Sequence, residues 1–388
     1  MLAYLDNSAT TRPTDGVIDA MSRCMREGYF NPSSLYAPAI DSEKAMRACR
    51  EELASALCVS PKGIFFTSGG TEANNLAILG RAEAKPRFAG GKILTTAGEH
   101  ASVEHTLALL ESRGYEVVRI PTVGGELDFT TLEAACDGRV FLATFMTVNI
   151  ETGALYDIRR AASIVHTKCP NALVHTDATQ AFLKVPCSPS ALGADMMTVS
   201  GHKIGAVKGI GGLWISPAVV RTHGIVARTV GGGQESDFRS GTENMPGIAA
   251  FAAAAEAGRK RFAESAAKTE AEREYLLSRI GEDAAFADVR LHLPACHAPH
   301  ILSLAVCGLP SETLLNYLGS HGICVSAGSA CSSNAGHARA SGALTAFGLS
   351  EKEAASTIRL SFSAANTKEE ADIFLAVLGE GLRTLYRR

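Results

Sequence analysis

Short apolar runs alternate with amphipathic stretches along the first half of the chain. The helical spacing of apolar residues predicts helices over 15–27, 41–57, 102–113, 130–135 and 158–168. Short apolar runs predict strands over 63–67, 93–96, 116–120, 140–148 and 172–176, with two more over 196–199 and 212–215. Because helices separate most of these strands, the connections are right-handed crossovers and the sheet is mainly parallel, covered by helices on both faces. The pattern predicts an α/β fold.

The pattern changes after Gly231-Gly-Gly233. Residues 248–279 have the pattern of one long, charged helix, and the remainder mixes short strands with short helices. A chain of 388 residues is long for a single core, which favours two domains. We predict a large domain over 15–247 and a smaller α+β domain built from 1–14 and 248–388. The smaller domain would carry a mobile loop over about 326–342, where nearly every residue is small or polar.

The composition is that of an ordinary soluble globular protein, with 46% hydrophobic and 20% charged residues. A net charge of −3, with no basic run interleaved with aromatics, excludes nucleic acid and anionic membrane as expected partners. The first residues lack the basic and apolar parts of a secretory signal, and no apolar stretch is long enough to span a membrane. Ten scattered cysteines show neither a CxxC motif nor a Cys/His cluster at metal-ligand spacing. We therefore expect no metal site and a reducing, cytoplasmic setting.

Polar residues directly follow five of the predicted strands. They are Ser68-Gly-Gly-Thr71, Glu99-His100, Asn149, Asp177 with Gln180, and Ser200 with His202 and Lys203. Ligands of an open parallel sheet bind at the carboxyl ends of its strands, so we expect these side chains to converge on one pocket. A lysine taken alone is most often a solvated loop residue, and it is this convergence that singles out Lys203.

Three features of this set match the needs of pyridoxal phosphate. Lys203 offers an amine for the aldehyde, and Asp177, at the end of an apolar strand, offers an acid for the ring nitrogen. The segment Ser68-Gly-Gly-Thr71 opens an apolar helix and would direct backbone N–H groups at the phosphate, although a simple N-cap has the same residues. The sequence thus favours a pyridoxal-phosphate enzyme.

A second candidate centre is Cys331, within a stretch of small and polar residues from Val325 to Gly342. Cysteines are usually buried, so one in an exposed loop indicates thiol chemistry. The other nine cysteines lie mostly in apolar or helical settings, where small core residues are expected.

With these motifs the chain resembles the pyridoxal-phosphate cysteine desulfurases of the NifS/IscS type, within the class V aminotransferase family. The matching segments run in the family's order over essentially the whole chain. They are Tyr4-Leu-Asp-Asn-Ser-Ala-Thr-Thr11, Asn31-Pro-Ser-Ser34, Thr67-Ser-Gly-Gly-Thr-Glu-Ala-Asn-Asn75, Glu99-His100, His175-Thr-Asp-Ala-Thr-Gln180, Ser200-Gly-His-Lys203, Gly231-Gly-Gly-Gln-Glu235, Arg239-Ser-Gly-Thr-Glu-Asn244, Gly328-Ser-Ala-Cys331 and Ile358-Arg-Leu-Ser361.

The resemblance implies a fold-type I homodimer and a role for each site residue. Lys203 would hold the cofactor and move protons, His100 would stack on its ring and act in acid–base steps, and Asp177 and Gln180 would bind the ring nitrogen and ring hydroxyl. The phosphate would be held by Gly70, Thr71, Ser200 and His202, with Thr242 from the other subunit. Arg359 and Asn31 would bind the carboxylate of L-cysteine. Cys331 would take the substrate's sulfur, leaving alanine and a persulfide for a protein acceptor in iron–sulfur, tRNA-thiolation or selenium pathways.

Two positions depart from the family pattern. Where the family has a second Asn, this chain has Ile150, which cannot donate a hydrogen bond to the ring hydroxyl. Asn149 points to the opposite face of the strand and is not an obvious substitute. We predict a raised pKa for the lysine–cofactor linkage and slower turnover. The second departure, Ala206-Val207 in place of Gly-Pro, removes no catalytic group.

Other functions remain open. A selenocysteine lyase, an aminotransferase or an epimerase could use the same fold, but the retained Cys331 favours desulfuration because the other reactions need no thiol. Selenocysteine lyase is the harder of these to exclude, since some desulfurases perform both reactions. The chain could also be a catalytically inactive partner protein that keeps the fold. Only Ile150 favours this alternative, and the intact Lys203, Asp177 and His100 argue against it.

Overall fold

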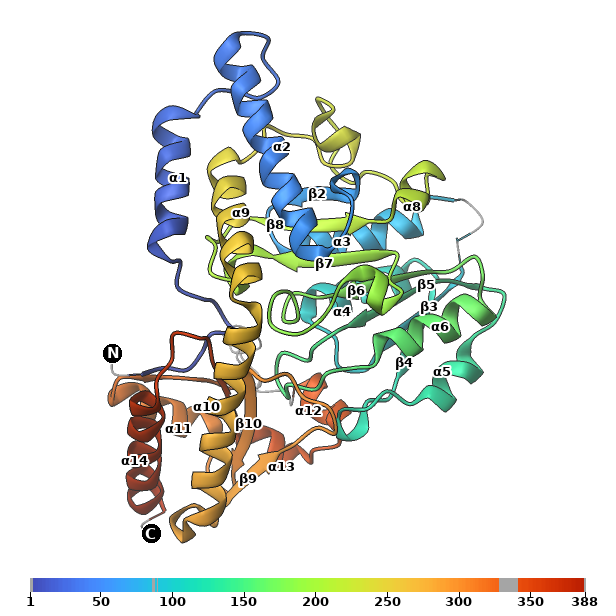
Figure 1. Ribbon diagram of the computed structural model, residues 1–388. Helices are drawn as coiled ribbons and strands as arrows, with labels where there is room; N and C mark the ends of the chain where they lie inside the picture. The colour runs from blue at the N-terminus through green and yellow to red at the C-terminus, as the bar shows by residue number, and fades with distance from the viewer. Residues whose placement is uncertain (1–2, 86–87, 89, 328–340, 387–388) are drawn as a thin grey trace.

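The computed structural model describes residues 3–85, 88, 90–327 and 341–386 (Figure 1). Its largest layer is a seven-stranded sheet in the order β2-β8-β7-β6-β5-β3-β4. The strands are β2 (Ile64–Thr67), β3 (Lys92–Thr96), β4 (Glu116–Ile120), β5 (Val140–Met146), β6 (Leu173–Asp177), β7 (Met196–Ser200) and β8 (Gly211–Ile215). Within this sheet only β8 runs antiparallel to its neighbours β2 and β7, and every other pairing is parallel. The predicted α/β fold with a mainly parallel, mixed sheet is confirmed.

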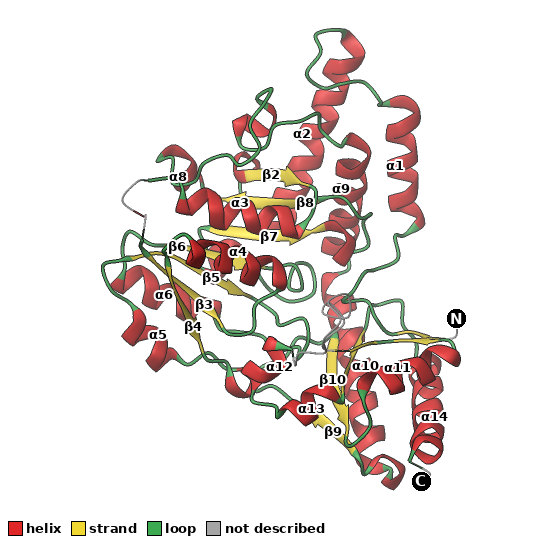
Figure 2. Ribbon diagram, turned by 180° about the vertical axis from the view of Figure 1, so that it is seen from behind, coloured by secondary structure: helices red, strands yellow, loops and turns green. Residues whose placement is uncertain are grey.

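Helices cover both faces of this sheet (Figures 1 and 2). They are α1 (Asp15–Glu27), α2 (Ala37–Leu57), α3 (Gly70–Ala82), α4 (Ala101–Ser112), α5 (Phe129–Ala135), α6 (Ile158–Lys168), α7 (Pro189–Leu192), α8 (Pro217–Arg221) and α9 (Met245–Lys260). Side chains alternate along each strand, so Met196 packs with α3 and α4 while Met197 packs with α2 and α9. Burial on both faces explains why these strands are continuous apolar runs.

A smaller sheet lies near the two termini and has the order β12-β13-β10-β9. Its strands are β9 (Val289–His292), β10 (Ile301–Val306), β12 (Ser326–Ala327) and β13 (Thr357–Ser361), and all of its pairings are antiparallel. The remaining elements are β1 (Ala3–Tyr4) paired with β11 (Ile323–Cys324), and the helices α10 (Phe262–Glu282), α11 (Ser311–Ser320), α12 (Gly342–Phe347), α13 (Glu351–Ala355) and α14 (Lys368–Leu385). One core cluster joins this sheet to α10, α11 and α14, and it includes Ala3 and Leu5 from the N-terminal segment.

The long helix predicted over 248–279 is wrong in detail, because the chain bends at Arg261 between α9 and α10. The apolar face of α9 packs into the core of the large sheet, whereas α10 packs on the small sheet. Figure 1 shows α9 leading into α10 and so joining the two parts of the molecule. The predicted boundary after residue 247 falls inside α9, and the division into domains stays a prediction.

Apart from this long helix, two element boundaries differ from the prediction by two residues or more. Helix α2 begins at Ala37 and not at 41, because Pro38 occupies the first turn, where its missing N–H costs nothing. Strand β5 ends at Met146, and Val148 makes only an isolated bridge to Leu155. The segment after Met146 therefore leaves the sheet before Ile150 and can turn that side chain toward the neighbouring strand ends.

Candidate active site

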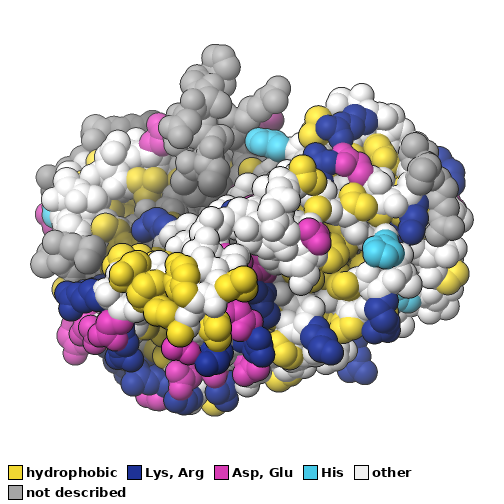
Figure 3. Space-filling view, turned by 90° about the horizontal axis from the view of Figure 1, so that it is seen from above, with side chains coloured by type: hydrophobic (Ala, Val, Ile, Leu, Met, Phe, Trp, Pro, Cys, Tyr) yellow, Lys and Arg dark blue, Asp and Glu magenta, His cyan; other side chains and the backbone are white. Residues whose placement is uncertain are grey.

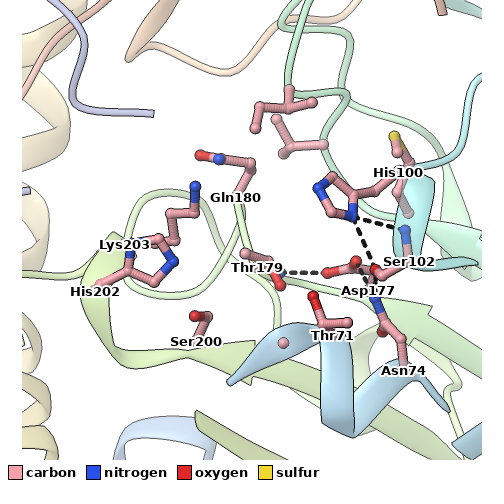
Figure 4. Close-up of a pocket in the computed structure, with 14 residues that line it drawn as sticks. Thr71, Asn74, His100, Ser102, Asp177, Thr179, Gln180, Ser200, His202 and Lys203 are labelled. Carbon is pink, nitrogen blue, oxygen red and sulfur yellow. Dashed lines mark hydrogen bonds between the residues drawn. The ribbon is translucent and has the colours of Figure 1, made fainter. Parts of the chain in front are cut away.

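A pocket of about 230 Å³ lies where the parallel strands of the large sheet end. Figure 4 shows its lining residues, contributed by the ends of β5, β6 and β7 and by the first turns of α3 and α4. The residues are Gly70, Thr71, Asn74, His100, Ser102, Met146, Val148, Ile150, Asp177, Thr179, Gln180, Ser200, His202 and Lys203. Eight residues predicted to serve a cofactor are among them, so the structure brings most of the strand-end set together. Ser68, Glu99 and Asn149, which were expected to converge with them, do not line the pocket.

Asp177 forms one end of this pocket, which we call the acid end. The residue is only 6% exposed, at the last position of β6. Its Oδ2 accepts a hydrogen bond from Asn74 Nδ2 at 2.7 Å, and its Oδ1 accepts one from the backbone N–H of Thr179 at 2.9 Å (Figure 4). A buried carboxylate needs such donors, and a carboxylate has lone pairs to spare for a third donor from the pocket.

His100 belongs to the acid end through a short chain of hydrogen bonds. It is the N-cap of α4, where its Nδ1 accepts a hydrogen bond from the backbone N–H of Ser102 at 3.1 Å. Ser102 Oγ lies 2.8 Å from the same nitrogen and accepts a hydrogen bond from Asn74 Nδ2 at 2.9 Å. Burial lowers the pKa of His100, against the opposing charge of Asp177. The imidazole is therefore neutral at pH 7, and with Nδ1 as an acceptor it carries its proton at Nε2.

Glu99 directly precedes His100 and lies beside the ends of β3 and β5. Its Oε1 accepts hydrogen bonds from Thr96 Oγ1 at 2.6 Å and from the backbone N–H of Met146 at 2.9 Å. Burial raises the pKa of Glu99 to about 8, and the nearby charge of Asp177 adds to this shift. The carboxyl group is thus protonated at pH 7 and ties β3 to β5 as a neutral group.

The start of α3 forms a wall suited to an anion. Thr179 Oγ1 is buried and has no hydrogen-bond partner among the described residues. A Cβ atom at Gly70 would lie 3.0 Å from that oxygen, so glycine lets the helix start approach the strand ends closely. The 13-residue helix turns its unpaired N–H groups to the same place, beside Thr71 and Ser200. These donors fit a phosphate group.

Lys203 enters the pocket from a short turn after β7, in the segment Gly201–Lys203. Its Nζ donates hydrogen bonds to the backbone carbonyl oxygens of Ser8 at 2.7 Å and Ala9 at 2.8 Å. The preceding His202 is hydrogen-bonded to the same N-terminal segment, through Thr10 Oγ1 and through the backbone N–H of Thr11. Burial and the neighbouring charge of Lys203 lower the pKa of His202 to about 4, so this ring is neutral at pH 7.

Gln180 and Ile150 form the other end of the pocket. We call it the oxygen end, because the sequence predicts that the ring hydroxyl of the cofactor lies there. Gln180 Nε2 donates to the carbonyl oxygen of Ser8 at 2.9 Å, and its Oε1 accepts from Lys184 Nζ at 3.0 Å. Asn149 is turned away: its Oδ1 accepts from the backbone N–H groups of residues 151 and 152, and its Nδ2 donates to the carbonyl oxygen of Gly98. The expectation that Asn149 does not replace the missing donor at Ile150 agrees with this geometry.

Four predicted site residues are not in the pocket lining. Arg359 is buried on β13 behind the pocket, where its Nη2 contacts Asp6 Oδ1 at 2.6 Å and its Nη1 donates to the carbonyl oxygen of Ile150 at 3.2 Å. Asn31 lies in an exposed turn, where its Oδ1 accepts from the backbone N–H of Ser33. Thr242 lines a second hollow of about 200 Å³, next to Thr67 and Ser68. Cys331 lies outside the described residues.

Three polar residues of the lining have no role predicted from the sequence. Asn74 and Ser102 connect the acid to the histidine, and Thr179 supports both the acid and the anion wall. Asn74 follows Gly70 by four positions on α3, so the two share a helix face, and this spacing was the available signal.

Comparisons with known proteins agree with this geometry. The family model for aminotransferase class V matches residues 3–374. A cysteine desulfurase of Trichormus azollae is 36% identical over 97% of this chain and 92% of its own length. The cysteine desulfurase IscS of Clostridium botulinum is 34% identical over 97% and 93%. A solved structure named NifS-like protein has a TM-score of 0.91 and 34% identity, covering 99% of this chain and all of its own.

The chain therefore belongs to the class V aminotransferase family. Within that family it belongs to the cysteine desulfurases of the NifS and IscS type, so the resemblance of the motifs is confirmed. No helix among the described residues is long and apolar enough to cross a membrane.

Proposed function

We propose that the protein is a pyridoxal-phosphate-dependent cysteine desulfurase that converts L-cysteine to L-alanine and receives the sulfur on Cys331 as a persulfide. The observation that carries this proposal is the convergence of Lys203, Asp177 and the start of α3 on one pocket. An amine, a buried acid and an anion wall are what this cofactor requires at its aldehyde, its ring nitrogen and its phosphate.

The pocket residues fit the cofactor in specific places. Thr71, Ser200 and His202 would hold the phosphate together with the backbone of Gly70, and the buried Thr179 hydroxyl is free to donate there. Asp177 would pair with the ring nitrogen and Gln180 with the ring hydroxyl. When bound, pyridoxal phosphate supplies an electron sink that stabilises negative charge on the substrate carbon.

The chain's own groups would move the protons. Lys203 Nζ would give up its hydrogen bonds to the carbonyl oxygens of Ser8 and Ala9. It would then take a proton from one carbon atom and deliver it to another. His100 Nε2 faces the same space, and because its lowered pKa keeps the imidazole neutral at pH 7, the ring would have the proton on Nε2 to donate. Asp177, held between its two hydrogen-bond donors, would pair with the ring nitrogen and favour its protonated form.

Arg359 would bind the substrate carboxylate. It is a buried guanidinium next to Ile150, and its Nε has no partner among the described residues. A solved relative 28% identical to this chain, with a TM-score of 0.79 over 94% of it and all of its own length, is titled SspA in complex with cysteine. We infer that L-cysteine enters between Ile150 and Lys203, where its carboxylate competes with Asp6 for the guanidinium.

A second copy of the chain would complete the site. Thr242 and Asn31 lie on surfaces outside the pocket, and both surfaces expose apolar side chains: Leu35 is 93% exposed, Tyr29 69% and Val230 84%. Figure 3 shows hydrophobic side chains gathered between charged ones on the face seen from above. Exposed apolar patches of this kind mark interfaces, and a homodimer would cover them and bring Thr242 to the partner's phosphate wall.

Mixing two variants tests the dimer. Lys203→Ala and Thr242→Ala proteins, each with reduced activity, would form mixed dimers with one intact site if the partner supplies Thr242. Random exchange would then restore about a quarter of the wild-type activity. Activity no higher than the average of the two separate proteins would contradict a shared site.

The desulfurase reaction is tested by adding L-cysteine and measuring alanine and sulfide together. Wild type should release alanine and, with a reductant, sulfide in equal amounts, whereas Cys331→Ser should release neither. Alanine release that survives in Cys331→Ser would overturn the persulfide step. If only selenocysteine supports that residual release, the protein is a selenocysteine lyase. The persulfide would pass to a protein sulfur acceptor, such as an iron–sulfur scaffold or a tRNA-thiolation relay.

A further inference from the structure

Lys184 lies in the turn after β6, four residues beyond Gln180. Its Nζ donates a hydrogen bond to Gln180 Oε1 at 3.0 Å, and no carboxylate forms an ion pair with it among the described residues. Leu183, directly before it, has φ +58°, a backbone conformation that a branched apolar side chain rarely adopts. The backbone is therefore strained at the residue that precedes Lys184 and helps to set the direction of its side chain toward the Gln180 amide.

The amide of Gln180 is held from both sides. Because Lys184 Nζ donates to Oε1, the oxygen of the amide faces Lys184. The NH₂ group then points the other way, and Nε2 donates to the carbonyl oxygen of Ser8 at 2.9 Å. Lys203 Nζ donates to that same oxygen at 2.7 Å. The amide NH₂ therefore sits beside the amine that carries the cofactor.

This placement matters for the ring hydroxyl. In pyridoxal phosphate the hydroxyl is attached to the ring carbon next to the one that bears the aldehyde, so a ring linked to Lys203 brings that oxygen close to Gln180. Ile150, on the pocket wall, offers no donor. Gln180 is then left to donate to this oxygen, and a flipped amide would present an acceptor to it instead.

We propose that Lys184 is a positioning residue that fixes the Gln180 amide with its NH₂ toward the ring hydroxyl of the cofactor. The proposal rests on the proposed function and deepens it. Lys203 and Arg359 are the other charged groups that face Lys184, and His300 lies among them as a buried ring with no partner on either nitrogen among the described residues. Burial, and after it the charges of Lys203 and Arg359, lower the pKa of Lys184.

The test compares holoenzymes of wild type, Lys184→Met and Lys184→Arg. The first readout is the pH midpoint at which the visible absorbance band of the lysine-linked cofactor changes. The second is the cofactor dissociation constant, measured by equilibrium dialysis. Losing the donor to the ring oxygen should raise the midpoint by about one pH unit in Lys184→Met. The dissociation constant should rise about tenfold, and Lys184→Arg should restore both values.

Controls separate positioning from a structural effect. Lys168→Met, at the exposed end of α6, should leave both values unchanged. In a Gln180→Leu background, Lys184→Met should add nothing further to the midpoint, because the amide it positions is gone. An additional shift in that background, or an unchanged midpoint in Lys184→Met alone, would overturn the proposal. A wild-type protein without a lysine-linked absorbance band would overturn the proposed function itself.

Discussion

The acid end and the oxygen end of the pocket are built in different ways. At the acid end, Asp177 accepts hydrogen bonds from Asn74 and from the backbone N–H of Thr179 in the following turn. Ser102 continues the chain of hydrogen bonds to His100. All of these residues stand at the ends of strands of one sheet or in the first turns of the helices that follow. At the oxygen end, Gln180 is held by Lys184 and by the carbonyl oxygen of Ser8, and Ile150 contributes only apolar surface.

The difference shows how the two ends depend on the rest of the chain. The N-terminal segment that supplies the Ser8 carbonyl is itself tied to the small sheet, through Ser8 N to Ser361 Oγ at 2.8 Å and through the Asp6–Arg359 ion pair. The oxygen end thus joins the large sheet to the small one, whereas the acid end stays within the large sheet. We expect changes at the acid end to abolish turnover and changes at the oxygen end to tune it.

The largest effect is expected at Asp177. Replacing it by Asn removes the acid that we propose pairs with the ring nitrogen, so turnover should fall by about 10³-fold. The rate of alanine release at saturating L-cysteine measures this, with cofactor content checked by absorbance. A loss of only a few-fold would show that the acid end does not govern the reaction.

A smaller loss is expected when Asn74 is replaced by Ala. This change removes one hydrogen-bond donor from Asp177 and breaks the hydrogen bond to Ser102. Because losing a hydrogen bond to a charged group costs about a factor of ten, we expect the rate to fall about tenfold. Asn75→Ala is the matched control, since that amide donates to the carbonyl oxygen of Thr71 on the same helix and does not line the pocket. Equal losses in the two variants would argue against the hydrogen-bond chain.

Ile150→Asn should improve the oxygen end. An added donor near the ring hydroxyl should lower the pKa of the lysine–cofactor linkage by about half a unit to one unit and raise turnover a few-fold. Absorbance recorded against pH gives the pKa, and alanine release gives the rate. If both stay at their wild-type values, the apolar residue at this position has no consequence.

The smallest effect concerns stability and Glu99. The pKa of Glu99 is raised to about 8 in the folded protein, above its ordinary value, so the folded state binds the extra proton. Its contribution to stability is complete in acid and is lost as the pH rises toward 8. Glu99→Gln removes this loss, so its stability relative to wild type should increase between pH 5 and pH 8 by about 1 kcal/mol or more. Urea unfolding at the two pH values measures the difference, and a pH-independent difference would contradict a buried neutral carboxyl.

Much of the site could be predicted from the sequence because short apolar runs and helical patterns locate the strand ends, and parallel strands bring those ends together. Asp177, Gln180 and Lys203 were found in this way. The pattern could not show that Ser8 and Ala9 would contribute main-chain carbonyls from the other end of the chain, because a carbonyl has no sequence signature. The bend at Arg261 was missed for a similar reason, since helical periodicity continues on both sides of it while the partner surface changes.

Asn31 and Thr242 are two residues whose predicted contacts with substrate and cofactor are not formed within a single chain. The resemblance placed both residues in the active site, yet in the single chain both lie on the surface. We propose that a second copy of the chain brings such residues to its pocket, and an exposed position near exposed apolar side chains is the sign they leave in a single chain.

The central claim is that Lys203 carries the cofactor in this pocket. Lys184 is a second lysine close to the pocket, so the experiment must show which of the two is linked to the cofactor. Borohydride reduction of the yellow holoenzyme fixes the cofactor on the lysine that holds it, and mass spectrometry of the digested protein locates the pyridoxyl group. We predict that it is found on the peptide containing Lys203. A pyridoxyl group on Lys184, or on no lysine of the chain, would contradict this account.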